Sequence, residues 1–132
     1  MPDWKRIFDP DGLNWWTIVS GMGMNFIFTA FLFLAVIGFT GEGVPPAVPT
    51  LTMSVGTFLI PLLTAYVCGR IADERYLTYG FYPLVGYMIL AVPSVFYAGV
   101  FGFLLILFGI LGAFNGATFA ARRAAKRRHI ID

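Results

Sequence analysis

The feature that most restricts the fold is a long uncharged stretch, because Tyr76 to Ala121 contains no Asp, Glu, Lys or Arg. One straight helix over this stretch would be roughly 70 Å long at about 1.5 Å per residue, more than twice the thickness of a bilayer's hydrocarbon core. The stretch must therefore fold back on itself. Pro93 removes a backbone donor and disfavours helical geometry at Val92, and Ser94 can cap a following helix. These residues predict a tight turn at 91–94 between two membrane helices.

The composition places the rest of the chain in the same class. Of the 132 residues, 58% are hydrophobic and 12% are charged, and the mean hydropathy is +0.79. The helices of a soluble domain need charged faces toward water, and this chain has too few charges to supply them. The sequence therefore predicts an all-α, polytopic integral membrane protein with a single domain.

Glycine, proline and charged residues divide the apolar sequence into four segments. These segments predict four transmembrane helices, arranged as two hairpins, at about 15–39, 50–68, 78–92 and 96–121. An N-terminal arm of residues 1–14 precedes this transmembrane domain of residues 15–121, and a basic tail of residues 122–132 follows it.

The placement of charge supports a count of four. Four spans put the N-terminal arm, the loop between the second and third helices and the tail on one side, and these segments hold all nine basic residues. The opposite side keeps only Glu42. By the positive-inside rule we expect both termini in the cytoplasm and the chain in the cytoplasmic membrane. Besides Lys5 and Arg6 of the arm, the expected topology and lipid anchors are Arg70, Arg75, Arg122, Arg123, Lys126, Arg127 and Arg128.

Small residues follow one face of the last predicted helix. They fall in two adjacent stripes at i+4 spacing: Gly109, Ala113, Ala117 and Ala121 in one, and Gly112, Gly116, Ala120 and Ala124 in the other. Such stripes let two helix backbones approach closely within a membrane. We interpret them as packing inside the four-helix bundle, and the alternative is a docking face for a partner subunit or another copy.

Asn25, Thr64 and Asn115 are the polar residues that we expect at a common depth, roughly 10–15 Å inside the cytoplasmic boundary at the usual helical rise. A buried amide needs hydrogen-bond partners, so we predict that the three side chains contribute to one polar layer between helices. The alternative is a polar site for a solute or a quinone-like headgroup.

Several functional classes lack their usual residues. No Asp, Glu, Lys, Arg or His lies within a predicted span, and the only histidine is His129 in the tail. Proton relays, buried haem or metal ligation and nucleophilic catalysis therefore have no candidate residues. We expect no enzymatic activity, no metal site, no cofactor of its own and no nucleic-acid binding, although contact with a partner's pigment or quinone is compatible with the sequence.

Two helix ends carry motifs that suggest a relationship. The second predicted helix ends in Cys68-Gly69-Arg70, and the last ends in Phe119-Ala-Ala-Arg-Arg123. With these motifs the layout resembles the small, largely uncharacterised four-helix membrane proteins common in bacteria, over roughly half of the chain. The resemblance implies the four-helix topology and a bacterial inner membrane, and it implies no function.

Two functional hypotheses fit these observations. The first is an accessory subunit that packs against larger membrane proteins, such as a respiratory or photosynthetic assembly, because the chain is small, has uncharged spans and carries 14 phenylalanines. The second is a small transporter or channel that assembles from several copies, with Asn25, Thr64 and Asn115 lining the path. Membrane lipids are partners in both hypotheses.

Overall fold

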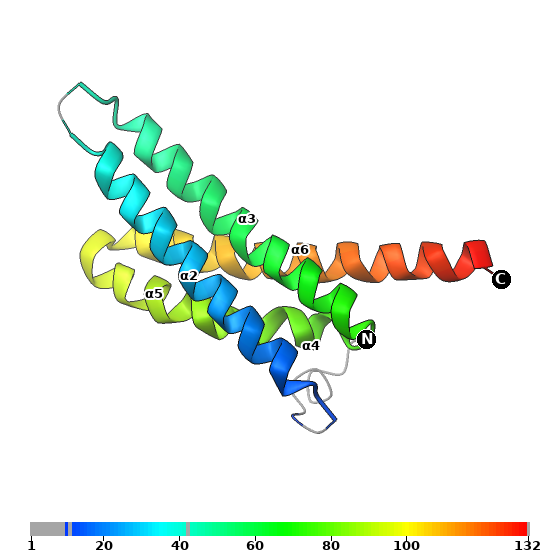
Figure 1. Cartoon of the computed structure of the whole chain (residues 1–132). Helices are drawn as coiled ribbons and strands as arrows, with labels where there is room; N and C mark the ends of the chain where they lie inside the picture. Colours follow the sequence, from blue (N-terminus) through cyan, green and yellow to red (C-terminus); the bar gives the residue numbers. More distant parts are fainter. Residues whose placement is uncertain (1–9, 11, 42, 132) are drawn as a thin grey trace.

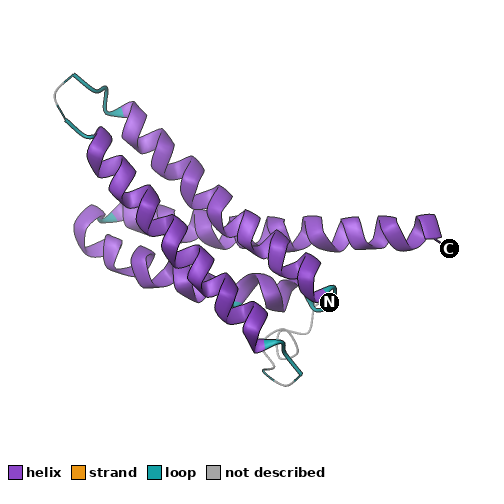
Figure 2. Ribbon diagram, in the orientation of Figure 1, coloured by secondary structure: helices purple, strands orange, loops and turns teal. Residues whose placement is uncertain are grey.

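The computed structural model describes residues 10, 12–41 and 43–131, with the backbone alone for Phe39 and residues 128–131. All the regular elements in these ranges are helices (Figures 1 and 2). They are α2 (Trp15–Phe39), α3 (Ala47–Ala72), α4 (Tyr76–Phe81), α5 (Leu84–Ala98) and α6 (Val100–Ile131). Of the features predicted from the sequence, most of the N-terminal arm, including Lys5 and Arg6, lies outside the described residues, as do Glu42 and the side chain of Arg128.

Three helices are long and apolar enough to cross a membrane, namely α2, α3 and α6, and α5 is a shorter apolar helix. The first of them, α2, has the predicted bounds. Its N-terminus is capped by Asn14, whose Oδ1 accepts a hydrogen bond from the backbone N–H of Thr17 at 3.4 Å. The chain is therefore an all-α protein of the membrane class, and its first helix begins where an Asx cap precedes the apolar run.

The second helix, α3, is longer than predicted at both ends. It begins at Ala47, directly after Pro46, which fits a helix N-terminus because that position needs no backbone donor. It ends when Asp73 adopts a left-handed conformation with φ 52°, and the Asp73 N–H bonds to the carbonyl of Gly69 at 2.8 Å. The polar loop predicted after residue 68 is thus confined to a few residues between α3 and α4.

The turn predicted at 91–94 is wrong, because α5 continues through Pro93 to Ala98. The hydroxyl of Ser94 does not cap a following helix and instead donates back to the carbonyl of Ala91 at 2.5 Å. The chain reverses at Gly99, whose φ of 59° and ψ of −125° suit glycine. Gly102 completes the turn, because a Cβ there would lie 2.6 Å from the Cα of Val95.

The third and fourth predicted helices therefore have different bounds. The segment predicted at 78–92 is split at Tyr82-Pro83 into α4 and α5, and the segment predicted at 96–121 begins only at Val100. At its other end α6 continues to Ile131, so the residues assigned to a tail from 122 onward belong to the same helix. In Figure 1 this end of α6, coloured orange to red, projects beyond the other helices.

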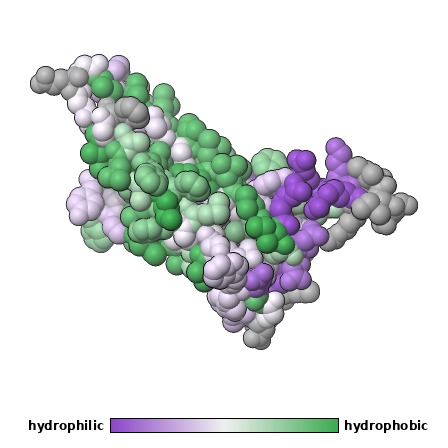
Figure 3. Space-filling model, viewed as in Figure 1, coloured by the Kyte–Doolittle hydropathy of each residue, from purple (hydrophilic) through white to green (hydrophobic). Residues whose placement is uncertain are grey.

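The two hairpins, α2–α3 and α5–α6, cross each other and pack together (Figure 1). The most extensive interface joins α3 to α6, and α2 packs on both α3 and α5. The short helix α4 packs against α3 and α6 at the end of the bundle near the N-terminus of α2. In Figure 3 the surface of the bundle is mainly hydrophobic, and hydrophilic residues gather over the projecting part of α6.

Candidate functional site

The interface between α3 and α6 brings two helix backbones into direct contact. A Cβ added at Gly112 would lie 2.2 Å from the carbonyl oxygen of Phe58, and one at Gly116 would lie 2.1 Å from that of Leu62. Both distances are far shorter than a van der Waals contact, so no larger residue fits without moving one helix. These two glycines therefore set the distance between α3 and α6.

The other small residues of the predicted face are also used inside the chain. Ala113, Ala117 and Ala120 are each 1% exposed, and Gly109 lies against the ring of Tyr87. A Cβ at Gly80 of α4 would meet the Cβ of Ala117 at 3.0 Å, so α4 also packs on this face. Ala121 is half-buried. The face predicted from the sequence is thus covered by α3, α4 and α5, and little of it remains for a partner.

Asn25 joins α2 to the break between α4 and α5. It is 1% exposed, and its Nδ2 donates to the carbonyl of Pro83 at 2.8 Å. Asn115 is half-buried, and its Nδ2 donates to the carbonyl of Leu111 in its own helix at 2.7 Å. Thr64 is buried, and its hydroxyl has no hydrogen-bond partner. Among the described residues, no hydrogen bond joins any two of the three predicted members of the polar layer.

Two of the buried threonines that the sequence-based prediction missed lie on the helices of Asn25 and Thr64. Thr29 lies four residues after Asn25 and Thr57 seven residues before Thr64, and both are 0% exposed. Spacings of four and seven place each threonine on the same helix face as its predicted neighbour, and this is the signal that could have identified them. The Thr29 hydroxyl and the Oδ1 of Asn25 have no hydrogen-bond partner, whereas Thr57 donates to the carbonyl of Met53.

The contrast between the two asparagines gives a matched test. We expect Asn25→Ala to lower the free energy of unfolding by about 1 kcal/mol, because it removes an interhelical hydrogen bond and leaves a cavity. Asn115→Ala removes only a bond within one helix and should change stability by less than about 0.5 kcal/mol. Reversible unfolding of the purified chain in mixed micelles measures both, and equal effects would contradict the assigned roles.

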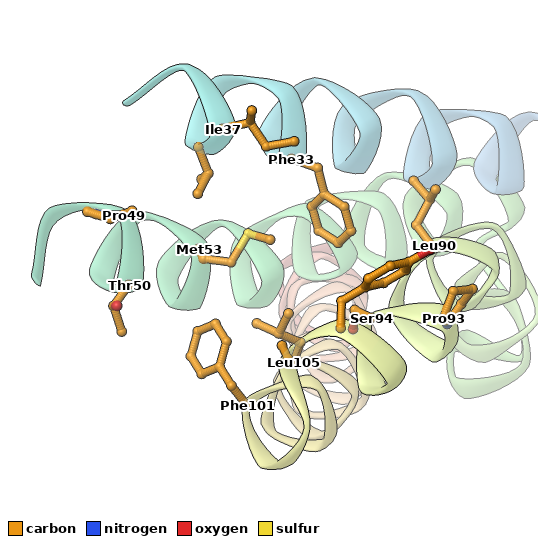
Figure 4. A pocket seen from close by; sticks show the side chains of 13 residues that line it. Phe33, Ile37, Pro49, Thr50, Met53, Leu90, Pro93, Ser94, Phe101 and Leu105 are labelled. Carbon is orange, nitrogen blue, oxygen red and sulfur yellow. The ribbon is translucent and has the colours of Figure 1, made fainter. Parts of the chain in front are cut away.

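An apolar cleft lies where the two hairpins diverge (Figure 4). Its volume is about 490 Å³, and its walls come from α2, α3, α5 and α6. They are formed by Phe33, Val36 and Ile37 of α2, Pro49, Thr50 and Met53 of α3, Leu90, Pro93, Ser94, Tyr97 and Ala98 of α5, and Phe101 and Leu105 of α6.

The side-chain hydroxyls of Thr50 and Ser94 in this cleft already donate hydrogen bonds to carbonyl groups of their own helical segments. The Thr50 hydroxyl donates to the carbonyl of Pro46 at 3.0 Å, and the Ser94 hydroxyl donates to that of Ala91. Tyr97 is 92% exposed at the edge of the cleft. The walls therefore offer almost no hydrogen-bonding groups, and the cleft suits an apolar occupant.

A second groove, of about 770 Å³, lies between α3 and the basic part of α6. Among the predicted anchors, Arg122, Arg123, Lys126 and Arg127 line it, and all four are exposed. Arg70 is also exposed and its Nη1 donates to the Tyr66 hydroxyl at 3.0 Å.

Within the described ranges, no group of three or more His, Cys, Asp or Glu side chains could hold a metal ion. Comparison with protein-family models, with curated proteins and with solved structures found no match to this chain.

Proposed function

We propose that this chain is a non-enzymatic integral membrane protein that acts as a small accessory subunit and packs against larger membrane proteins. The observation that carries the proposal is the apolar cleft between the diverging hairpins, to which α2, α3, α5 and α6 all contribute. A bundle that closed on itself would fill this space with its own side chains. The open cleft instead supplies a concave apolar surface for a helix of another subunit.

The remaining surfaces favour the cleft as the contact. The small residues that commonly mediate close helix–helix contacts in membranes are covered within the chain. Tyr97, a large side chain that lines the cleft, is 92% exposed. A partner helix seated in the cleft would cover this aromatic side chain, as it would in a respiratory or photosynthetic assembly.

We also propose that α4 and α5 together form the fourth span. Tyr82 and Pro83, which separate them, keep right-handed helical dihedral angles, so the path stays close to helical from Tyr76 to Ala98. At about 1.5 Å per residue this segment measures roughly 34 Å, enough to cross the hydrocarbon core. Four spans place both termini in the cytoplasm, as the distribution of basic residues indicates.

A native-mass experiment tests the accessory role. The tagged chain is extracted from its native membranes in mild detergent, and the mass of the species that carries it is measured. We expect a large assembly with other subunits at fixed stoichiometry. Ala98→Phe fills part of the cleft and should reduce the share of chain in that assembly roughly tenfold, as a loss of about 1.4 kcal/mol would.

Val92→Phe is the matched control. Val92 lies on α5 and is 49% exposed, and it does not line the cleft. It should therefore leave the assembly intact. Recovery of the unmodified chain alone, or equal loss with both variants, would contradict the proposal.

The alternative proposal is a self-assembling transporter or channel, which one observation favours. The Oδ1 of Asn25 and the hydroxyls of Thr29 and Thr64 are buried without hydrogen-bond partners, as expected of groups that meet water or a solute in another state. A homo-oligomer with a mass that is a discrete multiple of 14.6 kDa would support this alternative. Asn25 and Asn115 would then be the first residues to replace in a flux assay.

A further inference from the structure

One wall of the groove between α3 and α6 is basic, and a single face of α6 forms it. Phe119, Arg122, Arg123, Lys126 and Arg127 line it, and their spacing of i, i+3, i+4, i+7 and i+8 places them on one side of α6. Along this face, from the N-terminal to the C-terminal side, aromatic Phe119 comes first and the four basic residues follow it. The groove is therefore apolar toward the bundle and cationic toward the C-terminus.

The opposite wall, from α3, has the same polarity. Leu62 and Leu63 line the groove on the side of Phe119, and Tyr66 follows one turn later. The Tyr66 hydroxyl accepts a hydrogen bond from Arg70, and its electrostatic environment also includes Arg123. Tyr66 thus marks the boundary between the apolar and cationic parts of the groove.

Among the described residues, carboxylates neutralise little of the positive charge in the groove. Arg127 lies 3.6 Å from the carboxylate of Asp73. For Arg122, Arg123 and Lys126, no carboxylate of the described residues lies within ion-pair distance. Three cations and a tyrosine therefore face one groove with no carboxylate of the described part of the chain paired to them. Such an arrangement attracts an anion with several acceptor oxygens.

The position of the groove fits a membrane surface. Along α6 the uncharged residues end at Ala121 and the basic residues begin at Arg122. In Figure 3 the hydrophilic residues lie directly beside the hydrophobic surface of the bundle. The apolar end of the groove is thus at the level of the acyl chains, and its cationic end is at the level of the headgroup layer.

We propose that this groove binds an anionic phospholipid, with the phosphate held by Arg122, Arg123 and Lys126 and an acyl chain along Leu62, Leu63 and Phe119. A free phosphate ester could use the cationic end alone. Because both walls also have an apolar end, the groove favours a molecule that carries a phosphate and an acyl chain. Basic pockets between membrane helices commonly bind anionic lipid headgroups. This site is separate from the apolar cleft proposed for a partner subunit.

The test uses the purified full chain in neutral detergent, and lipid binding is counted by native mass spectrometry. Dioleoyl phosphatidylglycerol is titrated against dioleoyl phosphatidylcholine, which has the same chains and no net charge. We expect phosphatidylglycerol to be retained at one molecule per chain and phosphatidylcholine to be lost at the same concentration. The double variant R123Q/K126Q should bind phosphatidylglycerol about 30-fold more weakly, which is about 2 kcal/mol for two basic groups.

Two controls make the result specific to the groove. Arg75→Gln removes a basic residue that does not line it and should leave the affinity within about twofold. Glycerol 3-phosphate, which lacks acyl chains, should neither bind nor displace the lipid at millimolar concentration. Equal retention of the two lipids, displacement by glycerol 3-phosphate, or equal weakening by Arg75→Gln and the double variant would each overturn the proposal.

Discussion

Gly116→Ala is expected to lower the free energy of unfolding by about 2 kcal/mol, although it adds only one methyl group. The new Cβ would lie 2.1 Å from the carbonyl oxygen of Leu62. Because that atom belongs to a helix backbone, the clash is relieved only when α3 and α6 move apart. Overpacking typically costs about 1–3 kcal/mol, and a contact with backbone falls at the upper end of that range. The higher helix propensity of alanine, worth about 1 kcal/mol, offsets only part of it.

Two other glycines provide a graded control for this substitution. A Cβ at Gly23 meets nothing within 4 Å, so Gly23→Ala should be neutral or slightly stabilising. At Gly56 the nearest atoms are the terminal methyls of Leu32 at 2.6 Å, which can rotate away, so the effect should be intermediate. Unfolding in mixed micelles would order the three variants. Surface substitutions usually change the free energy of unfolding by less than about 0.5 kcal/mol. If the Gly116 and Gly23 variants differed by no more than this amount, the backbones of α3 and α6 would not be in contact.

Gly86→Ala is expected to have an effect of similar size at a different interface. Its Cβ would lie 2.0 Å from the carbonyl oxygen of Met22, so the substitution separates α2 from α5. The loss in stability should again be about 2 kcal/mol. The two substitutions are distinguishable, because Gly86 joins the hairpins through α2 whereas Gly116 joins them through α3.

Trp15 reports on the second interface. Its ring lies 6.1 Å from that of Tyr82, centroid to centroid, in an edge-on arrangement at 62°. With Trp4 and Trp16 replaced by phenylalanine, the emission of Trp15 should shift in the Gly86→Ala variant. In Gly116→Ala it should change much less under native conditions. Identical spectra in both variants would contradict this assignment.

The sequence alone predicted the membrane class and the first helix, and it failed at the point of chain reversal. Pro93 predicts a turn because it removes a backbone donor, but membrane helices tolerate proline when other groups satisfy the backbone. The reversal instead uses Gly99, whose positive φ suits glycine. Both residues stood in the same uncharged stretch, and the deciding difference was a dihedral angle that hydropathy does not encode.

The asparagines show a second limit of sequence reasoning. Depth along a helix follows from counting residues, and Asn25 and Asn115 were placed at equal depth in this way. The direction of a side chain depends on which face of its helix is packed. Asn115 precedes Gly116 by one residue, so it points about 100° away from the face against α3. The direction of the Asn115 side chain thus depends on the packing of α6 against α3. This packing is a contact between the two hairpins, and counting residues along one helix does not reveal it.

The interface between α3 and α6 also has a consequence for biosynthesis. The carbonyl groups of Phe58 and Leu62 belong to the first hairpin, and the glycines that cover them belong to the last helix. While the ribosome is still making residues 100–131, α3 has no α6 to pack against. During this time the surface of α3 around the carbonyl groups of Phe58 and Leu62 is not covered by α6. A membrane chaperone or a neighbouring subunit would find its binding surface at that stage of synthesis.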